Sequence, residues 1–455
     1  ADSTDQLKAA ARTMQAYVAE STGAVLPITV AQSNEAAHDA KARIWLGFKQ
    51  MAAKLDFRLE KLDDDGFVIA FPSADDILIC GPTDWGTKFG IYRFLELYLG
   101  IMWIIPGADG DHVPQRESVF IKRKETRENP TFIQRNLGGL KGPVQHAWAD
   151  RNGLHRIASY GHNLYRVIDP EVYAKTHPEF FPLINGRRHI PEKGAKHKWQ
   201  PCLTAQGIVD AAVDSINAYF DSHPNKEFFS LGLNHGHLWC QCTQCQALDT
   251  GNKNYLGFKD HSDRYFTWAN KMVQGVLQRH PDKWFGILAH QSLAEAPTRV
   301  ILHPHIVPFI TYDFMKWVDA DLAQVSKRVN LRWAAVSNRL GWYDYLYGTP
   351  YCLPRVYFHQ MADYYRFAEA NKVRYIAAEA FPNWGEGPKY YLSLRLQWDP
   401  YQSVDALLDK WYKASVGEEA APYLKAYFRI WESFWTERIP KSKWFSRKGN
   451  YLPFK

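Results

Sequence analysis

Apolar and polar positions follow different periods in different parts of the 455-residue chain. Residues 7–23 and 83–100 have a helical period, and the second stretch ends at Gly100, a frequent helix stop. Between these stretches, "ARIWLG" and "DDILICG" are short apolar runs that predict strands. Together these elements predict a small α/β domain at residues 1–122.

From about residue 131, apolar runs alternate with amphipathic stretches. Helices are predicted over residues 206–222 and 264–279. Strands are predicted for "TFIQRNLGG", "EFFSLGLN", "KWFGILAH", "HIVPFITYD", "RLGWYDY" and "VRYIAAEAF". This alternation predicts the α/β class, most simply a (β/α)8 TIM-like barrel at residues 128–400. The pattern then becomes helical, which predicts a helical C-terminal region at residues 401–455.

Polar residues follow several of the predicted strands directly. In a parallel barrel the carboxyl ends of the strands meet at one face, where active sites lie. The residues that this arrangement would bring to one rim are His162, Asn163, Asn234, His235, His290, Asp313, Tyr343, Asp344 and Glu379.

Aromatic residues make up 15% of the chain, and 17 residues are tryptophan. Flat apolar rings can stack on sugar rings, and they can equally fill a large core. Trp239, Trp342 and Trp384 lie beside the predicted strand ends. We expect them either to stack on a carbohydrate or to pack the rim.

The formal net charge of +7 comes from scattered basic residues, without the dense basic tract that binds nucleic acid. A basic surplus can steer an anionic substrate toward a protein. The sequence predicts no membrane span. It begins with "ADSTDQ", without an initial Met, as expected of a secreted or periplasmic protein after removal of its signal peptide, and equally of a trimmed chain.

Four stretches resemble a bacterial family: "KTHPEFFPLINGRR", "QPCLT", "FFSLGLNHGHLWCQCTQCQALD" and "YYLSLRLQWDPYQSVDALLDKWY". They are similar to glycoside hydrolase family 163, the endo-β-N-acetylglucosaminidases of complex N-glycans, and to a related domain of unknown function. Residues 1–106 resemble the domain that precedes the barrel in family 67 α-glucuronidases. The sequence departs from the family 163 pattern at "NHG" (234–236) and "AEAF" (378–381), where the family has Asn-Asp-Gly and Phe-Glu-Gln-Gly. The resemblance implies a secreted glycoside hydrolase for a complex glycan.

Glycoside hydrolysis needs an acid for the leaving oxygen and a group that stabilises the developing positive charge on the sugar. Glu379 is the predicted general acid, because the apolar strand around it would raise the pKa of its carboxyl group. Asp344 is the predicted second carboxylate, or the group that polarises the acetamide of an N-acetylhexosamine in a substrate-assisted reaction. Tyr343 is the predicted hydrogen-bond donor, with Asp313 and Glu386 as alternative carboxylates.

The remaining rim residues are predicted to bind the substrate. Sugar hydroxyls would contact His162, Asn163, Asn234, His235 and His290. Two alternative functions fit the same residues: a glycosidase of this fold that acts on an acidic polysaccharide, and a non-catalytic carbohydrate-binding protein. None of these functions calls for a catalytic cofactor.

Four of the six cysteines form a separate candidate site: Cys202, Cys240, Cys242 and Cys245. Their Cys-X-Cys-X-X-Cys core is too compact for an ordinary zinc ribbon, but Cys202 can complete a closed structural zinc site. In an exported protein, one or two disulfides are the competing interpretation. Either arrangement would hold the loop after the fourth strand.

Overall fold

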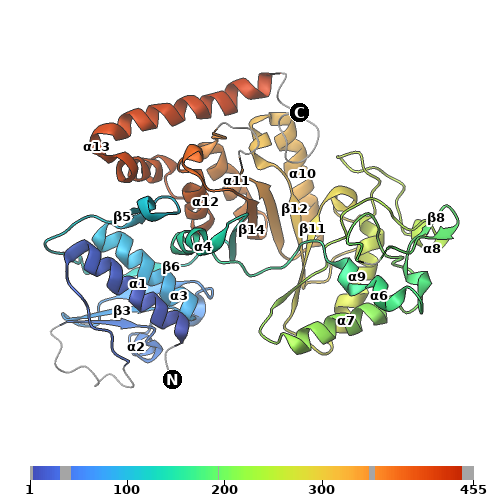
Figure 1. Ribbon diagram of the computed structural model, residues 1–455, viewed down its shortest axis with the longest axis horizontal. Coiled ribbons are helices and arrows are strands. Elements are labelled where there is room, and N and C mark those ends of the chain that lie inside the picture. The colour runs from blue at the N-terminus through green and yellow to red at the C-terminus, as the bar shows by residue number, and fades with distance from the viewer. Residues whose placement is uncertain (1–3, 31–41, 193, 348–353, 443–455) are drawn as a thin grey trace. The chain divides into compact units, whose positions relative to one another are not determined.

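The computed structural model describes residues 4–30, 42–192, 194–347 and 354–442 (Figure 1). The chain forms two compact units, each assembled from segments that are distant in sequence. Unit 1 comprises Ala1–His155, Tyr347–Ala362 and Ala380–Ser433, and unit 2 comprises Arg156–Leu346, Asp363–Glu379 and Phe434–Lys455. The three domains predicted from the sequence, at residues 1–122, 128–400 and 401–455, are divided differently and remain a prediction.

Unit 1 contains a small mixed sheet with the strand order β1-β3-β2-β6. β1 and β3 are parallel, and the other two pairs are antiparallel. The strands are β1 (Arg43–Leu46), β2 (Phe67–Ala70), β3 (Asp76–Cys80) and β6 (Thr126–Glu128). Helices α1 (Asp5–Thr22) and α3 (Asp84–Phe94) pack against each other (Figure 1). Both strands and both helices predicted in this region are confirmed.

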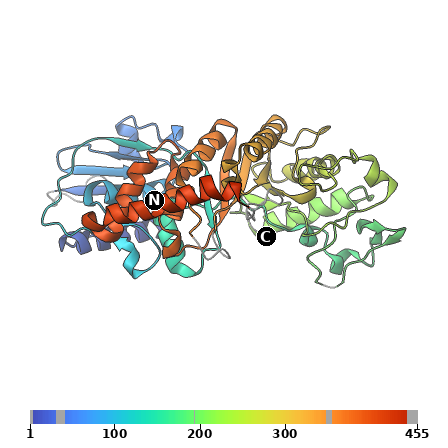
Figure 2. The same cartoon turned by 90° about the horizontal axis from the view of Figure 1, so that it is seen from above.

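The other elements of unit 1 come from two stretches of the chain, residues 1–155 and 380–433. They are α2 (Lys49–Lys54), β4 (Met102–Trp103), β5 (Asp111–His112), β7 (Gln134–Gly138), α4 (Gly142–Arg151), α12 (Lys389–Trp398) and α13 (Val404–Ser433). The predicted helical character after residue 400 is confirmed by α13, red in Figures 1 and 2. The helix is kinked at Gly417, whose φ of 81° is the left-handed conformation that glycine adopts most easily.

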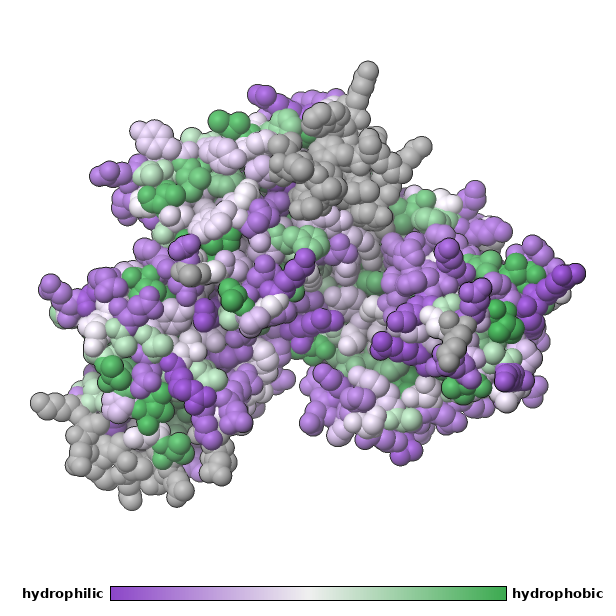
Figure 3. Space-filling view, viewed as in Figure 1, coloured by the Kyte–Doolittle hydropathy of each residue, from purple (hydrophilic) through white to green (hydrophobic). Residues whose placement is uncertain are grey.

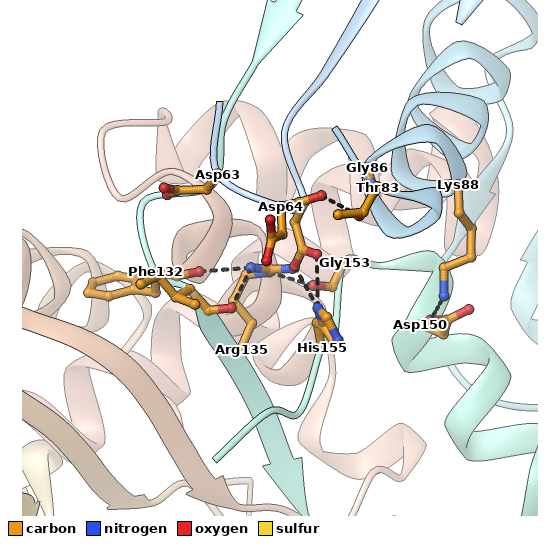
Figure 4. A network of polar contacts seen from close by, with 12 residues as sticks. Asp63, Asp64, Thr83, Gly86, Lys88, Phe132, Arg135, Asp150, Gly153 and His155 are labelled. Carbon is orange, nitrogen blue, oxygen red and sulfur yellow. Dashed lines mark hydrogen bonds and ion pairs between the residues drawn. The ribbon is translucent and has the colours of Figure 1, made fainter. Parts of the chain in front are cut away.

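Arg135 of β7 lies at the centre of a buried polar network (Figure 4). Its guanidinium donates to the carbonyl oxygens of Phe132 and Gly153, at 2.7 and 2.6 Å, and pairs with Asp65 at 2.6 Å. Asp65 also lies 2.9 Å from Nδ1 of His155. Because Arg135 and Asp65 are both buried, each compensates for the water that the other has lost. Asp65, Arg135 and His155 are called the unit 1 network below.

Unit 2 supplies five of the six strands in the largest sheet. These five follow the order β10-β11-β12-β13-β14, and every neighbouring pair is parallel. Their bounds are Phe228–Ser230, Trp284–Ala289, Ile306–Thr311, Leu340–Tyr345 and Val373–Glu379. All five lie within runs that the sequence predicted as strands.

Helices and a hairpin complete the described part of unit 2. The helices are α5 (Leu164–Val167), α6 (Pro170–Tyr173), α7 (Ile208–Ser222), α8 (Thr243–Ala247), α9 (Ser262–Leu277) and α10 (Ala320–Val336), and the hairpin strands are β8 (Leu183–Ile184) and β9 (Arg187–Arg188). Helix α11 (Phe358–Ala370) contains residues of both units. α7 and α9 confirm the two helices predicted between the strands.

The predicted closure into an eight-stranded barrel is not found among the described residues. The largest sheet is a parallel half-barrel of six strands. Between α4 and α7 the chain forms short helices, turns and a hairpin where a barrel needs further strands. Residues 185–198 are mostly polar, and Pro182 interrupts the apolar run before them. Such a segment cannot provide a strand that is buried on both faces.

The backbone of residues 159–161 lies against the parallel sheet. A Cβ atom added to Gly286 of β11 would approach the carbonyl oxygen of Ser159 to 2.2 Å, so this contact requires glycine. Tyr160 packs on Phe309 of β12, with 4.2 Å between ring centroids, and against Tyr343 of β13 at 5.8 Å. This packing fixes the ring of Tyr343 near the carboxyl ends of the strands.

On the face shown in Figure 3, hydrophobic residues occur in small groups among hydrophilic ones. Among the residues that the structure describes, helices long and apolar enough to cross a bilayer are absent.

Candidate functional site

Glu379 is the last residue of β14, at the carboxyl edge of the parallel sheet. Its Oε1 atom accepts a hydrogen bond from the hydroxyl group of Tyr343, at 2.6 Å. Burial raises the pKa of Glu379 above its usual value, and the bond from Tyr343 offsets part of that effect. The side chain is half-buried, so a ligand at this edge can reach it. A carboxyl group of this kind retains its proton to a higher pH than an exposed glutamate does.

Asp344 follows Tyr343 on β13 and points to the opposite side of the strand, as successive strand residues do. Its carboxylate accepts hydrogen bonds from the backbone N–H groups of Phe314 and Tyr345, at 3.1 and 2.7 Å, and from the Tyr364 hydroxyl at 3.1 Å. Its exposed fraction is 1%. The structure therefore does not bring Asp344 together with Glu379, and it gives Asp344 the contacts of a buried structural residue.

Trp342 and Asp313 also lie in the core. Trp342 has an exposed fraction of 0%, stacks on Phe314 at 3.8 Å between centroids, and donates from Nε1 to Asn330 at 2.6 Å. Asp313, directly after Tyr312 at the end of β12, is likewise fully buried. Trp342 therefore presents no face on which a sugar can stack, and the carboxylate of Asp313 is enclosed within the fold.

A second group of predicted residues surrounds a small pocket beyond the carboxyl ends of β10 and β11. The pocket is lined by His162, Leu233, Asn234, Gly236, Trp239, Leu288, His290, Gln291 and Ser292. Four of the predicted substrate-binding residues thus share one pocket, although they come from three separate stretches of the chain.

Histidines give this pocket its electrostatic character. Burial lowers the pKa of His290 to about 4, with further lowering by His162, His235 and His237. Burial likewise lowers the pKa of His162 and of His237. His235 is exposed, with its ring edge-on to that of His162 at 5.3 Å. At neutral pH the imidazoles of His162, His237 and His290 are therefore uncharged and offer both hydrogen-bond donors and acceptors.

Two buried polar atoms of the pocket's lining residues have no hydrogen-bond partner among the described residues: Nε1 of Trp239 and Nδ1 of His290. Trp239 has an exposed fraction of 6%, and its ring lies 4.5 Å from that of His261. A buried N–H group without an acceptor costs free energy until a ligand or a water molecule accepts its hydrogen bond. The indole N–H of Trp239 is therefore an unpaired donor within the residues that line the pocket.

Asn163 and Asn234 hold the backbone around the pocket. Asn163 donates from Nδ2 to the carbonyl oxygen of Ser230, at 2.9 Å. Asn234 accepts from the Tyr165 N–H at 2.6 Å and donates to the carbonyl of Trp199 at 3.1 Å. Both amides are engaged with the main chain, and their predicted contact with sugar hydroxyls remains a prediction.

The backbone conformation at position 236 explains why the Asn-His-Gly motif ends in glycine. Its φ is 139°, and an added Cβ atom would approach the backbone of Lys198 to 2.5 Å. The backbone of residues 197–200 lies beside this loop, with bonds from Lys198 N–H to His235 and from Gln200 N–H to Leu238, at 2.6 and 3.0 Å. A larger residue at position 236 would push apart two neighbouring strips of backbone, of which the one at 233–239 lines the pocket.

Trp384 and Glu386 belong to unit 1. Trp384 is 50% exposed, as a sugar-stacking residue would be. Glu386 is buried and forms an ion pair with Lys389, and it accepts the backbone N–H of Arg355 at 3.3 Å. This pairing suits a structural carboxylate better than an alternative acid.

The four cysteines predicted as a metal site do cluster. Their sulfur atoms all lie within 4.8 Å of one another, and none of the four forms a disulfide. Cys202, Cys240 and Cys245 are buried and Cys242 is partly exposed. Cys352, the sixth cysteine, lies outside the described residues.

The sequence interpretation missed several residues of the site. Ser292 lines the pocket close to His290, and His237 lowers the pKa of His290. Gln200, whose exposed fraction is 0%, braces Asn234 through its side chain. His237 and Ser292 could have been found by extending each strand-end motif, because their neighbours in sequence were already candidates. Gln200 carried no such signal.

A family model described as "Domain of unknown function (DUF4838)" matches residues 105–429. No curated protein matches the chain. Among solved structures, a family GH115 4-O-methyl-α-glucuronidase, BtGH115A, with specificity for decorated arabinogalactans, has a TM-score of 0.56 and 12% identity, over 94% of this chain and 60% of that chain. A family 89 glycoside hydrolase from Clostridium perfringens, in complex with 2-acetamido-1,2-dideoxynojirmycin, has a TM-score of 0.52 and 10% identity, over 98% of this chain and 54% of that chain.

At 10 to 12% identity these likenesses show a shared fold. The chain spans 54 to 60% of the length of these two glycoside hydrolases. The finer resemblance to families 163 and 67 remains a prediction.

Proposed function

The chain belongs to the family described as a domain of unknown function, DUF4838, and from this premise we propose that it is a glycoside hydrolase with Glu379 as its general acid. The observation that carries the proposal is the half-buried carboxyl group of Glu379 at a strand end, with a raised pKa and a bond from Tyr343. A glycosidase needs such a group, because the acid must hold a proton until the leaving oxygen takes it. The fold shared with two glycoside hydrolases supports the same conclusion.

The proposed substrate is a glycan that contains an N-acetylated, uncharged sugar. The uncharged imidazoles of His162 and His290 favour hydroxyl and amide groups over carboxylates, since they supply no positive charge at neutral pH. The unpartnered Nε1–H of Trp239 suits the carbonyl oxygen of an acetamide. The Clostridium perfringens relative in fold was solved with an acetamido sugar analogue, which supports this choice.

The proposed reaction uses the acetamide of the substrate as the nucleophile. The carboxyl group of Glu379 protonates the glycosidic oxygen while the bond from that oxygen to C1 breaks, and the acetamide oxygen forms a bond to C1. Water then attacks C1, the acetamide oxygen leaves, and the carboxylate of Glu379 takes a proton from that water. This route needs one protein carboxylate, which agrees with the position of Asp344 on the other side of β13.

The proposal is tested by product release from a panel of glycans with wild type, Glu379→Gln and Glu227→Gln. Glu227 is a matched control, because it is exposed and directly precedes β10, at the opposite edge of the sheet from Glu379. The panel contains complex N-glycans beside uronic acid polysaccharides. We expect wild type and Glu227→Gln to release an N-acetylhexosamine-containing product, and Glu379→Gln to release at least 100-fold less.

Each other outcome has a definite meaning. Release of a uronic acid would replace the proposed substrate by an acidic one and keep the acid. Equal release by Glu379→Gln and wild type would remove Glu379 from the reaction. Binding of a glycan without release by any of the three proteins would make the chain a carbohydrate-binding protein.

A further inference from the structure

We propose that Cys202, Cys240, Cys242 and Cys245 bind one zinc ion that anchors the wall of the pocket. Four sulfur ligands around zinc at about 2.3 Å form a tetrahedron whose corners are about 3.8 Å apart. The sulfur of Cys202 lies 3.8 Å from that of Cys242 and 3.9 Å from that of Cys245. These two distances match the spacing of a tetrathiolate site, and all four sulfur atoms lie within 4.8 Å of one another.

The surroundings of the sulfur atoms suit thiolates better than disulfides. A disulfide needs about 2.05 Å between sulfurs, and all four cysteines are free thiols in the structure. Two backbone N–H groups donate to sulfur: that of Leu183 to Cys240 at 3.2 Å, and that of Cys245 to Cys242 at 3.4 Å. Thiolate sulfurs of a metal centre accept such bonds, which share their negative charge with the main chain.

Charge compensation is also present. Four thiolates and one zinc ion carry a net charge of −2, which needs positive partners when it is largely buried. The guanidinium of Arg188, on the hairpin strand β9, interacts with Cys202, Cys240 and Cys242. The hydroxyl of Thr204 lies 3.2 Å from the sulfur of Cys245. The cluster thus has the outer partners that structural zinc sites use.

The proposed ion would join two segments that are separate in sequence, the one at Cys202 and the continuous stretch 240–245. Cys202 precedes α7, Cys240 and Cys242 follow β10, and Cys245 lies in α8. The hairpin β8–β9 is attached through the bond from Gln241 N–H to the carbonyl of Leu183, at 2.8 Å. Its residues are mostly polar and half-exposed or exposed, so a metal would supply the stability that a small apolar core cannot.

The cluster is continuous with the pocket wall. Cys240 directly follows Trp239, and its carbonyl accepts a hydrogen bond from Arg264 at 2.9 Å. Arg264 pairs with Asp249, which also lies 3.0 Å from Nδ1 of His261, whose ring packs on Trp239. Zinc at the cysteines would hold Trp239 in its place in the pocket. The zinc site itself stands whether or not the chain is a glycosidase.

The first experiment uses the wild-type protein, purified without added chelator. We expect elemental analysis to find one zinc per chain, and X-ray absorption at the zinc edge to show four sulfur neighbours at about 2.3 Å. A protein without metal whose four thiols react with iodoacetamide under denaturing conditions would overturn the proposal. Loss of two hydrogen atoms in mass for each cysteine pair would establish disulfides in its place.

The second experiment compares Cys242→Ser with Cys80→Ser. Cys242 is the most exposed of the four ligands, and Cys80 is a buried free thiol of β3 that lies in unit 1. We expect zinc content to fall from one per chain to near zero in Cys242→Ser and to remain one in Cys80→Ser. Zinc retained by both variants, with an unchanged absorption spectrum, would rule out the tetrathiolate site. Circular dichroism of both variants verifies that they fold.

Discussion

Asp65 is buried and Glu379 is half-buried, yet the pKa values of their carboxyl groups are shifted in opposite directions. Burial alone would raise the pKa of Asp65, but Arg135 and His155 hold it below its usual value. Burial raises the pKa of Glu379, whose hydrogen-bond partner, Tyr343, is uncharged and offsets only part of the effect. The comparison shows that the charge of the partner, more than the burial, decides whether a buried carboxyl group keeps its proton.

The charge of the partner also separates a carboxyl group that stabilises the fold from one that can transfer a proton. The carboxylate of Asp65 pairs with Arg135 and contacts His155, and Arg135 in turn donates to the carbonyl oxygens of Phe132 and Gly153. These contacts stabilise the fold of unit 1. Glu379 has an uncharged partner and partial exposure, which leaves its proton available to a ligand. Perturbed carboxyl groups of the second kind are the ones that concentrate at active sites.

The largest expected effect is on the rate of Glu379→Gln. We expect kcat/KM to fall by about 10²–10⁴-fold, because the amide cannot donate a proton to the leaving oxygen. The free energy of unfolding should stay equal to that of wild type or rise, since a buried amide avoids the cost of a buried charge. Steady-state kinetics and urea unfolding measure both quantities. A decrease in the free energy of unfolding as large as the increase in the activation free energy would show that Glu379, like Asp65, is a structural carboxylate.

The converse variant, Asp65→Asn, should lose stability. It leaves the fully buried guanidinium of Arg135 without its carboxylate, at a cost of about 3–5 kcal/mol in the free energy of unfolding. Asp64→Asn is the matched control, because the neighbouring Asp64 side chain is exposed. Urea unfolding of both variants gives the comparison. Equal stability of the two would show that the ion pair of the unit 1 network contributes little.

Asp344→Asn tests whether Asp344, the neighbour of Tyr343 on β13, has a structural role. Its carboxylate accepts two backbone N–H groups and the Tyr364 hydroxyl, so the substitution should cost about 1–3 kcal/mol of stability. The folded variant should keep its kcat within about tenfold of wild type, because Asp344 faces away from Glu379. A loss of kcat comparable to that of Glu379→Gln, with normal stability, would restore Asp344 as a catalytic carboxylate.

The smallest expected effects are shifts with pH. The lowered pKa of Asp65 contributes stability that is present above its unfolded pKa, about 3.9, and is lost as pH falls through the folded value. The raised pKa of Glu379 contributes stability that is present below about 4.3 and is lost as pH rises through the folded value. The free energy of unfolding is measured from pH 3 to pH 8 in roughly unit steps for wild type, Asp65→Asn and Glu379→Gln. The difference between wild type and Asp65→Asn should increase with pH, and the difference between wild type and Glu379→Gln should decrease with pH.

Tyr343→Phe tests whether the uncharged partner of Glu379 influences the pH dependence of the reaction rate. Removal of the hydroxyl removes the bond that lowers the pKa of Glu379, so the alkaline limb of the pH–rate profile should move to higher pH. A limb that stays in place would show that another group controls it.

The sequence predicted strands and helices correctly where the pattern lies within a few neighbouring residues. The apolar runs of β10–β14 and the helical periods of α7 and α9 were recognised, and so was Glu379 as the residue that ends a buried strand. The neighbours Tyr343 and Asp344 were both predicted at the rim, although strand alternation allows only one of them to face it. Which of the two faces Glu379 depends on the register between β13 and β14, a contact between distant segments.

The sequence by itself therefore determined the period, position and order of the strands and helices, because these follow from side-chain pattern and backbone preference within a few residues. Only the tertiary structure decided that the sheet is a half-barrel, that Asp344 is enclosed by η6 (Phe314–Val318) and α11, and that four cysteines meet. It also decided the opposite pKa shifts of Asp65 and Glu379. Burial and partners set these properties, and both are supplied by parts of the chain far away in sequence.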